Sequence, residues 1–262
     1  MSTDPFAAVA RLEGVGVGAA HARDAIDAVL RQPAMRRGAG LVAAEAVVRG
    51  ARASVRMGDA EWDAGPDERH EQAGTEELAD PTLQGALRAI RELPVLAPTW
   101  ESSPRRALAR LHVLAARNLV DDDALGRPRP GVDEARLDQL LRLTTATTVA
   151  PGVVVAALAH AELREIAPFG SADAVVARAV ERLILVLRGV DTKAVTVPEA
   201  GHLELRDDDA PALRGYRSGM SAGVGVWVRH CCDAYARGAE EGLRIARQVD
   251  GSNAEGANGE PG

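Results

Sequence analysis

Apolar residues recur three or four positions apart along most of the chain. This spacing runs through residues 6–12, 21–30, 41–55, 83–90 and 108–115, and it is typical of one face of an α-helix. Three of these segments follow a capping residue and a proline, a pairing that favours a helix N-terminus: Asp4-Pro5, Asp80-Pro81 and Ser103-Pro104. The pattern therefore predicts an all-α fold.

Further helices are predicted in the second half of the chain, over residues 132–141, 154–166, 171–187 and 223–245. The helix over 171–187 is apolar on a broad face, which indicates a core helix. Ser171 is a plausible N-cap for it, because a serine hydroxyl accepts a hydrogen bond from a free backbone N–H in the first turn.

Three segments lack this periodicity. Residues 59–80 are acidic and contain Gly65-Pro66, which predicts a mobile loop. Residues 121–131 hold turn residues and two prolines, which predicts a loop or a short β-hairpin. We divide the chain into a helical extension with the acidic loop (1–80), a main helical domain (81–248) and a disordered Gly/Asn/Glu tail (249–262).

Composition narrows the possible functions. The formal net charge is −7 and the pI is near 5.5, so we expect no general binding to nucleic acid or to anionic membranes. The two cysteines are neighbours, so a disulfide framework is not expected. Residues 1–5 lack a basic region, and we see no apolar run that would span a bilayer. A cytoplasmic location is the resulting expectation.

The segment Ala-Pro-Phe-Gly-Ser-Ala-Asp-Ala-Val-Val-Ala-Arg separates two of the predicted helices and begins at Ala167. It resembles the signature of the Fic (Fido) family: His-Pro-Phe, any residue, Asp or Glu, Gly-Asn-Gly-Arg, and a further arginine three residues on. Without gaps, Pro168, Phe169 and Arg178 match. Ala167 stands where the family has its histidine.

This resemblance implies chemistry for which the chain lacks the required groups. The family histidine is the general base that lets a target hydroxyl attack the α-phosphate of ATP, and Ala167 has no lone pair. Ser171 replaces the carboxylate that holds magnesium. Ala172 and Ala174 replace the glycines of the phosphate-binding turn, and Val175 replaces the arginine that clamps a phosphate.

Similarity to Fic proteins extends along residues 39–247. The predicted helices over 132–141 and 182–190 resemble family helices, and the loop at 121–131 lies where the family carries a peptide-binding flap. Glu45 to Gly58 resembles the helix with the inhibitory Ser-x-Ile-Glu-Gly motif, with Met57 in place of the glutamate. The resemblance implies a Fic/Fido-like helical domain at 81–248.

Several residues that remain could line the former catalytic cleft, and we call their site the remnant pocket: His160, Pro168, Phe169, Ser171, Asp173 and Arg178. His160 is predicted to form hydrogen bonds in the core, the alternative being a substitute base. Asp173 is predicted to complement the helix dipole, the alternative being a metal ligand or base. Arg178 either meets an anion or pairs with Glu181 or Glu162.

A second group of polar residues, His230 to Asp233, includes both cysteines. Adjacent residues on a helix point about 100° apart, so Cys231 and Cys232 cannot easily close around one zinc ion. We therefore predict a packing role for this group and no metal site.

Three functions are compatible with the sequence. The leading hypothesis is a degenerate Fic-like protein without AMP transfer and without a cofactor. It serves as a protein-binding or regulatory module that uses the remains of the cleft and flap to bind an unknown protein partner. The second is a nucleotidyl or phosphoryl transferase with a rearranged site using Asp173, His160 or Arg178, with ATP and magnesium. The third is a helical scaffold that forms homo-oligomers.

Overall fold

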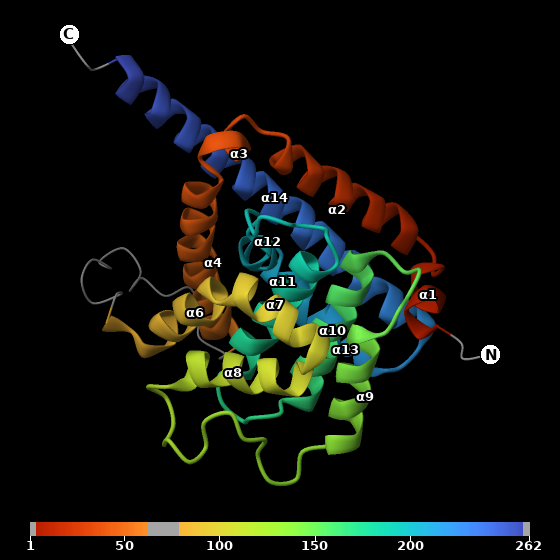
Figure 1. Cartoon of the computed structure of the whole chain (residues 1–262). Helices are drawn as coiled ribbons and strands as arrows, with labels where there is room; N and C mark the ends of the chain where they lie inside the picture. The colour runs from red at the N-terminus through yellow and green to blue at the C-terminus, as the bar shows by residue number, and fades with distance from the viewer. Residues whose placement is uncertain (1–3, 62–78, 259–262) are drawn as a thin grey trace.

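The computed structural model describes residues 4–61 and 79–258. Within these ranges the chain forms helices joined by turns and loops, and none of the described residues forms a strand (Figure 1). The predicted all-α class is therefore confirmed. Most of the predicted acidic loop, residues 62–78, lies outside the described residues.

Four helices precede the acidic segment: α1 (Pro5–Ala10), α2 (Val15–Leu30), α3 (Ala34–Arg37) and α4 (Ala39–Glu61). Asp4 caps α1 as predicted, because its carboxylate accepts a hydrogen bond of 3.1 Å from the backbone N–H of Ala7. Helix α2 begins earlier than predicted. Gly14, with φ of 74°, turns the chain directly into it.

The central helices are α6 (Pro81–Arg91), α7 (Leu93–Ser102), α8 (Pro104–Ala116), α9 (Glu134–Thr145), α10 (Gly152–Ile166) and α11 (Asp173–Leu187). Asp80 caps α6, with its carboxylate 2.7 Å from the backbone nitrogen of Thr82. In α10, every residue from Val153 to Ala161 is buried, and so is every residue of α11 from Val175 to Leu185. These two helices pack on each other at the centre of the fold.

The C-terminal helices are α12 (Pro198–Glu204), α13 (Arg206–Arg217) and α14 (Ser221–Asn258). The structure corrects the tail predicted from residue 249, because α14 continues to Asn258. Extending a packed helix adds hydrogen bonds without the cost of a new nucleus. The Asp250 carboxylate also accepts a hydrogen bond from the backbone N–H of Ala34, which ties this part of α14 to α3.

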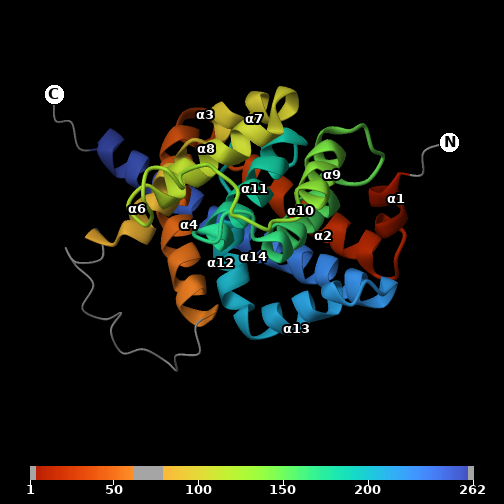
Figure 2. The same ribbon diagram turned by 90° about the horizontal axis from the view of Figure 1, so that it is seen from below.

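Both ends of the chain contribute to one core. Helix α2 lies along α14 (Figure 1), and the two run in the same direction: Arg229 binds the carbonyl of Glu13 near their starts, and Asp250 binds Ala34 near the other end. A contiguous buried cluster extends from Phe6 through α10 and α11 to Ala246. In Figure 2, α7 and α8 lie at one edge, α13 lies at the opposite edge, and α10 and α11 lie between.

The segment 121–131 forms a loop, so the alternative of a short β-hairpin is wrong. Pro128 and Pro130 have no backbone N–H to donate to a ladder, which explains the absence of strand pairing here. Hydrogen bonds to residues outside the loop hold it in place instead. The backbone N–H of Arg129 donates to the carbonyl of Pro168, and that of Gly126 donates to His112.

Candidate functional site

The turn between α10 and α11 brings together four members of the remnant pocket and is left-handed at two alanines. Ala167 ends α10 with φ of 43°, and Ala172 precedes α11 with φ of 51°. Alanine visits this region at a cost of roughly 1–2 kcal/mol, so the surrounding contacts must hold the turn. Helix α11 begins at Asp173 and not at Ser171, and the predicted Ser171 cap is therefore corrected.

Asp173 binds the turn from within. Its carboxylate accepts hydrogen bonds from the backbone N–H groups of Phe169 (3.0 Å) and Gly170 (2.6 Å). Burial raises the pKa of Asp173 above the ordinary aspartate value, although both N–H groups favour its charged form. Two N–H groups of the turn that could face an anion are thus already paired with a side chain of the same chain.

Arg129 closes the other side of this turn. Its Nε donates to the carbonyl of Ala167 at 2.8 Å, and its Nη2 donates to that of Ile166 at 3.4 Å. The last carbonyls of a helix lack partners within it, and arginine is well suited to satisfy them. The loop at 121–131 is therefore fastened to the C-terminus of α10.

His112, which lies on α8, also contacts this turn, and the sequence did not identify it as part of the site. Its ring stacks on Phe169 with centroids 4.0 Å apart and planes 6° from parallel. Its Nδ1 accepts a hydrogen bond from Gly126, which leaves Nε2 to donate to the hydroxyl of Ser171 at 3.2 Å. Burial lowers the pKa of His112 to about 4. The helical spacing from Leu108 was the available signal, because it places His112 on an apolar face.

Arg178 reaches α4 and not the turn. Its Nε donates to the Ser54 hydroxyl and its Nη2 donates to the Ser54 carbonyl, both at 2.9 Å. The guanidinium group is buried. The predicted partners bind elsewhere, since Glu162 accepts from Arg136 and Glu181 accepts from histidine and tyrosine. The α4 segment that resembles the inhibitory helix thus lies beside the arginine of the motif.

His160 lies on α10 within the core, apart from the turn. Its Nδ1 is 3.0 Å from Glu181, which also contacts His202 and accepts a hydrogen bond of 2.7 Å from Tyr235. Burial lowers the pKa of His160 to about 4, despite the nearby carboxylate of Glu181. His160 is buried and contacts Glu181, as expected for a histidine that forms hydrogen bonds in the core. Of the remnant pocket, only Pro168, Phe169, Ser171 and Asp173 share the turn.

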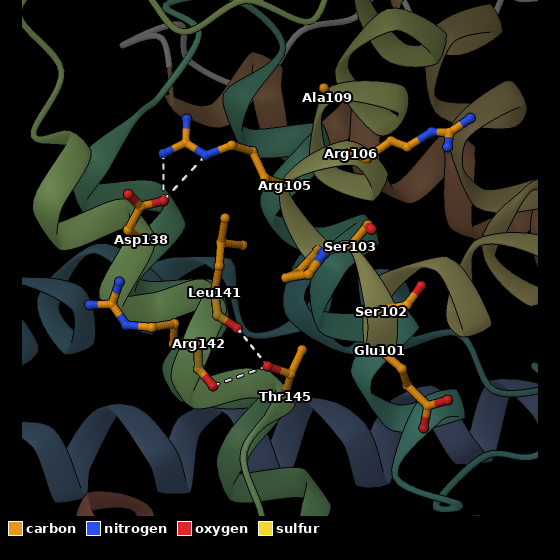
Figure 3. A pocket seen from close by; sticks show the side chains of 11 residues that line it. Glu101, Ser102, Ser103, Arg105, Arg106, Ala109, Asp138, Leu141, Arg142 and Thr145 are labelled. Atoms are coloured by element: carbon orange, nitrogen blue, oxygen red, sulfur yellow. Dashed lines mark hydrogen bonds and ion pairs between the residues drawn. The ribbon is translucent and has the colours of Figure 1, made fainter.

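A separate surface hollow of about 680 Å³ lies between the α7–α8 junction and α9 (Figure 3). Arg105 crosses one side of it and pairs with Asp138 at 2.6 Å and with Glu134 at 2.8 Å. Arg106 and Arg142 also line it, together with several hydroxyl groups. No member of the remnant pocket contributes to this hollow.

Comparisons with known proteins found similarity at the level of three-dimensional structure. Scans against protein-family models and against curated proteins found no match. Among solved structures, the chain is similar to a Fic family protein from Desulfovibrio desulfuricans G20, with 17% sequence identity and a TM-score of 0.69. The match covers 89% of this chain and 75% of that one. Within the described residues no helix has both the length and the apolar character needed to cross a membrane. The chain has the fold of Fic proteins.

Proposed function

We propose that this protein does not transfer AMP and acts as a protein-binding or regulatory module on a Fic fold. The observation that carries the proposal is the pairing of Asp173 with the N–H groups of Phe169 and Gly170. A triphosphate at this turn would have to displace a carboxylate and would meet its negative charge. The turn stabilises the fold at the expense of anion binding.

The neighbouring positions support the same conclusion. Ala167 supplies no base, and its backbone carbonyl is bound by Arg129. Val175, at the position of the phosphate-clamping arginine, is buried at 6% exposure. Arg178 is held by Ser54 on α4. Binding a nucleotide here would require several of these contacts to break together.

A transferase with a rearranged site is less well supported. It would need Asp173, His160 and Arg178 to converge on one substrate. Asp173 binds its own turn, His160 binds Glu181 in the core, and Arg178 binds Ser54. These three side chains therefore bind three separate partners.

Restoring the residues of the family motif tests whether their replacement abolished ATP binding and AMP transfer. The restored chain carries Ala167→His, Ser171→Asp, Ala172→Gly, Asp173→Asn, Ala174→Gly and Val175→Arg. We expect calorimetry to show no binding of magnesium ATP by the wild type. We expect labelled AMP to be transferred to protein only by the restored chain.

A matched control keeps Ala167 and restores the other five positions. It should bind ATP without transferring AMP, because the turn is open but no base is present. Micromolar, magnesium-dependent ATP binding and AMP transfer by the wild type would overturn the proposal.

The hollow beside α9 is the surface that we assign to the partner. Arg106 and Arg142 are exposed there, which suits an acidic segment of another protein. Arg106→Glu with Arg142→Glu should abolish retention of a partner that the wild-type chain retains. Arg36→Glu with Arg37→Glu makes the same charge change on α3 and should not. Equal retention by both variants would exclude this surface.

A further inference from the structure

Three helices bring potential ligand atoms close together in the core. They come from His202 on α12, Asp209 on α13 and His230 on α14, which are 0%, 4% and 7% exposed. One potential ligand atom from each side chain lies within 4.8 Å of the others. This group is distinct from the turn at Ala167 and is independent of the proposed function.

Each of these side chains has a buried atom without a hydrogen-bond partner among the described residues: Nδ1 of His202, Oδ1 of Asp209 and Nε2 of His230. The Asp209 and His230 atoms are 3.6 Å apart. This is slightly too long for a hydrogen bond. Nitrogen and oxygen ligands at tetrahedral zinc, about 2.0–2.1 Å from the ion, lie about 3.4 Å from each other.

The other atoms of two of these side chains are held by charged groups. Nε2 of His202 lies 3.1 Å from Glu181, so the ring donates to a carboxylate and leaves Nδ1 as a lone pair. Oδ2 of Asp209 accepts a hydrogen bond of 2.6 Å from Arg164. A histidine oriented by a carboxylate is the arrangement that metal sites use to fix ligand direction.

A surface hollow lies next to one member of this group, His230. A hollow of about 350 Å³ lies between α13 and α14, and His230 lines it together with Asp208 and Asp233. The hollow places solvent next to His230, the most exposed of the three side chains. Asp208 and Asp233 outnumber Arg229 among the charged residues that line the hollow, which favours the approach of a cation.

We propose that His202, Asp209 and His230 bind a divalent transition-metal ion through two imidazoles and one carboxylate. This donor set suits zinc and neighbouring metals better than magnesium or calcium, which prefer oxygen ligands. The ion joins α12, α13 and α14 and satisfies three buried polar atoms at once. The ligands are far apart in sequence, and this is why the local pattern at His230 to Asp233 did not predict them.

Metal analysis of the untagged full-length chain tests the site. After removal of metals with a chelator and dialysis against zinc, we expect one zinc ion per chain. Asp209→Asn and His230→Gln should weaken zinc binding by about 100-fold or more, given that even outer partners of ligands contribute 10–100-fold. His21→Gln, which removes an exposed histidine, should leave zinc binding unchanged.

Cobalt distinguishes this site from a deeper cluster formed by His160, Glu181, His202 and Cys231. With nitrogen and oxygen ligands, cobalt in the folded wild type should show visible bands without a thiolate charge-transfer band. Cys231→Ser should not change the spectrum. Absence of stoichiometric zinc binding, undiminished binding by both ligand variants, or a thiolate band lost in Cys231→Ser would overturn the proposal.

Discussion

The Asp173 carboxylate accepts a hydrogen bond of 2.6 Å from the backbone N–H of Gly170 in the turn between α10 and α11. The same carboxylate binds the N–H of Phe169. A side chain at the N-terminus of α11 is therefore the partner of two N–H groups of the turn, a place where helix N-termini favour negative charge.

Asp173→Ala should lower the free energy of unfolding by about 1–3 kcal/mol, because two backbone N–H groups lose a charged acceptor. Asp173→Asn should cost less, since the amide oxygen can still accept one hydrogen bond. Urea denaturation measures both. Asp207→Ala is the control, because Asp207 also lies in the first turn of a helix but is fully exposed. A loss for Asp207→Ala equal to that for Asp173→Ala would contradict the assignment.

The buried ion pair between Arg182 and Glu199 should matter more than a shorter pair on the surface. Their side chains are 1% exposed and the closest atoms are 3.2 Å apart. Glu199→Ala leaves a buried guanidinium group without its carboxylate and should cost about 3–5 kcal/mol. Asp138→Ala breaks the 2.6 Å contact with exposed Arg105 and should cost about 0–1 kcal/mol. Similar losses in urea denaturation would refute this ranking.

His112 should make the fold sensitive to acid. Its pKa is lowered to about 4 in the folded chain, against an ordinary value near 6.5. The unfolded state therefore binds the proton first, and stability falls as the pH drops from about 6.5 to about 4. Protonation would also place a second hydrogen opposite the N–H of Gly126.

We expect the free energy of unfolding to fall by about 3 kcal/mol through His112 alone across this pH range. His112→Phe retains a ring to stack on Phe169 but cannot titrate, so its unfolding free energy should fall less steeply with acid than that of the wild type. His160 titrates in both chains and cancels from the difference. Identical pH slopes would show that His112 has no such effect.

Close backbone contact between α12 and α14 depends on Gly201. A Cβ atom at this position would lie 1.9 Å from the carbonyl oxygen of Ala234, which is backbone and cannot rotate away. Gly201→Ala should therefore lower the melting temperature, with a cost of at least about 1–3 kcal/mol. Gly40→Ala on α4 meets no atom within 4 Å and should be neutral or stabilising by up to about 1 kcal/mol. An unchanged melting temperature for Gly201→Ala would contradict the packing.

Much of the fold follows from local signals in the sequence. The caps at Asp4 and Asp80 and the apolar spacing of α8, α10 and α11 act over a few residues, so periodicity and capping chemistry predicted these helices. The likeness of the Pro168-Phe169 turn to the Fic motif pointed to the fold for the same reason. The residues at which helices end were less predictable. The extension of α14 depends on Asp250 reaching Ala34 on another helix.

The amino-acid order alone determined an all-α chain with a Fic-like turn that lacks the catalytic histidine. Tertiary structure decided where the remaining polar groups point: Arg178 toward Ser54, Asp173 into its own turn, and His202 toward Asp209 and His230. These contacts join residues that are distant in sequence or depend on left-handed alanines. Helical periodicity specifies which face of a helix is buried, but only the packing of helices against one another specifies which atoms meet there.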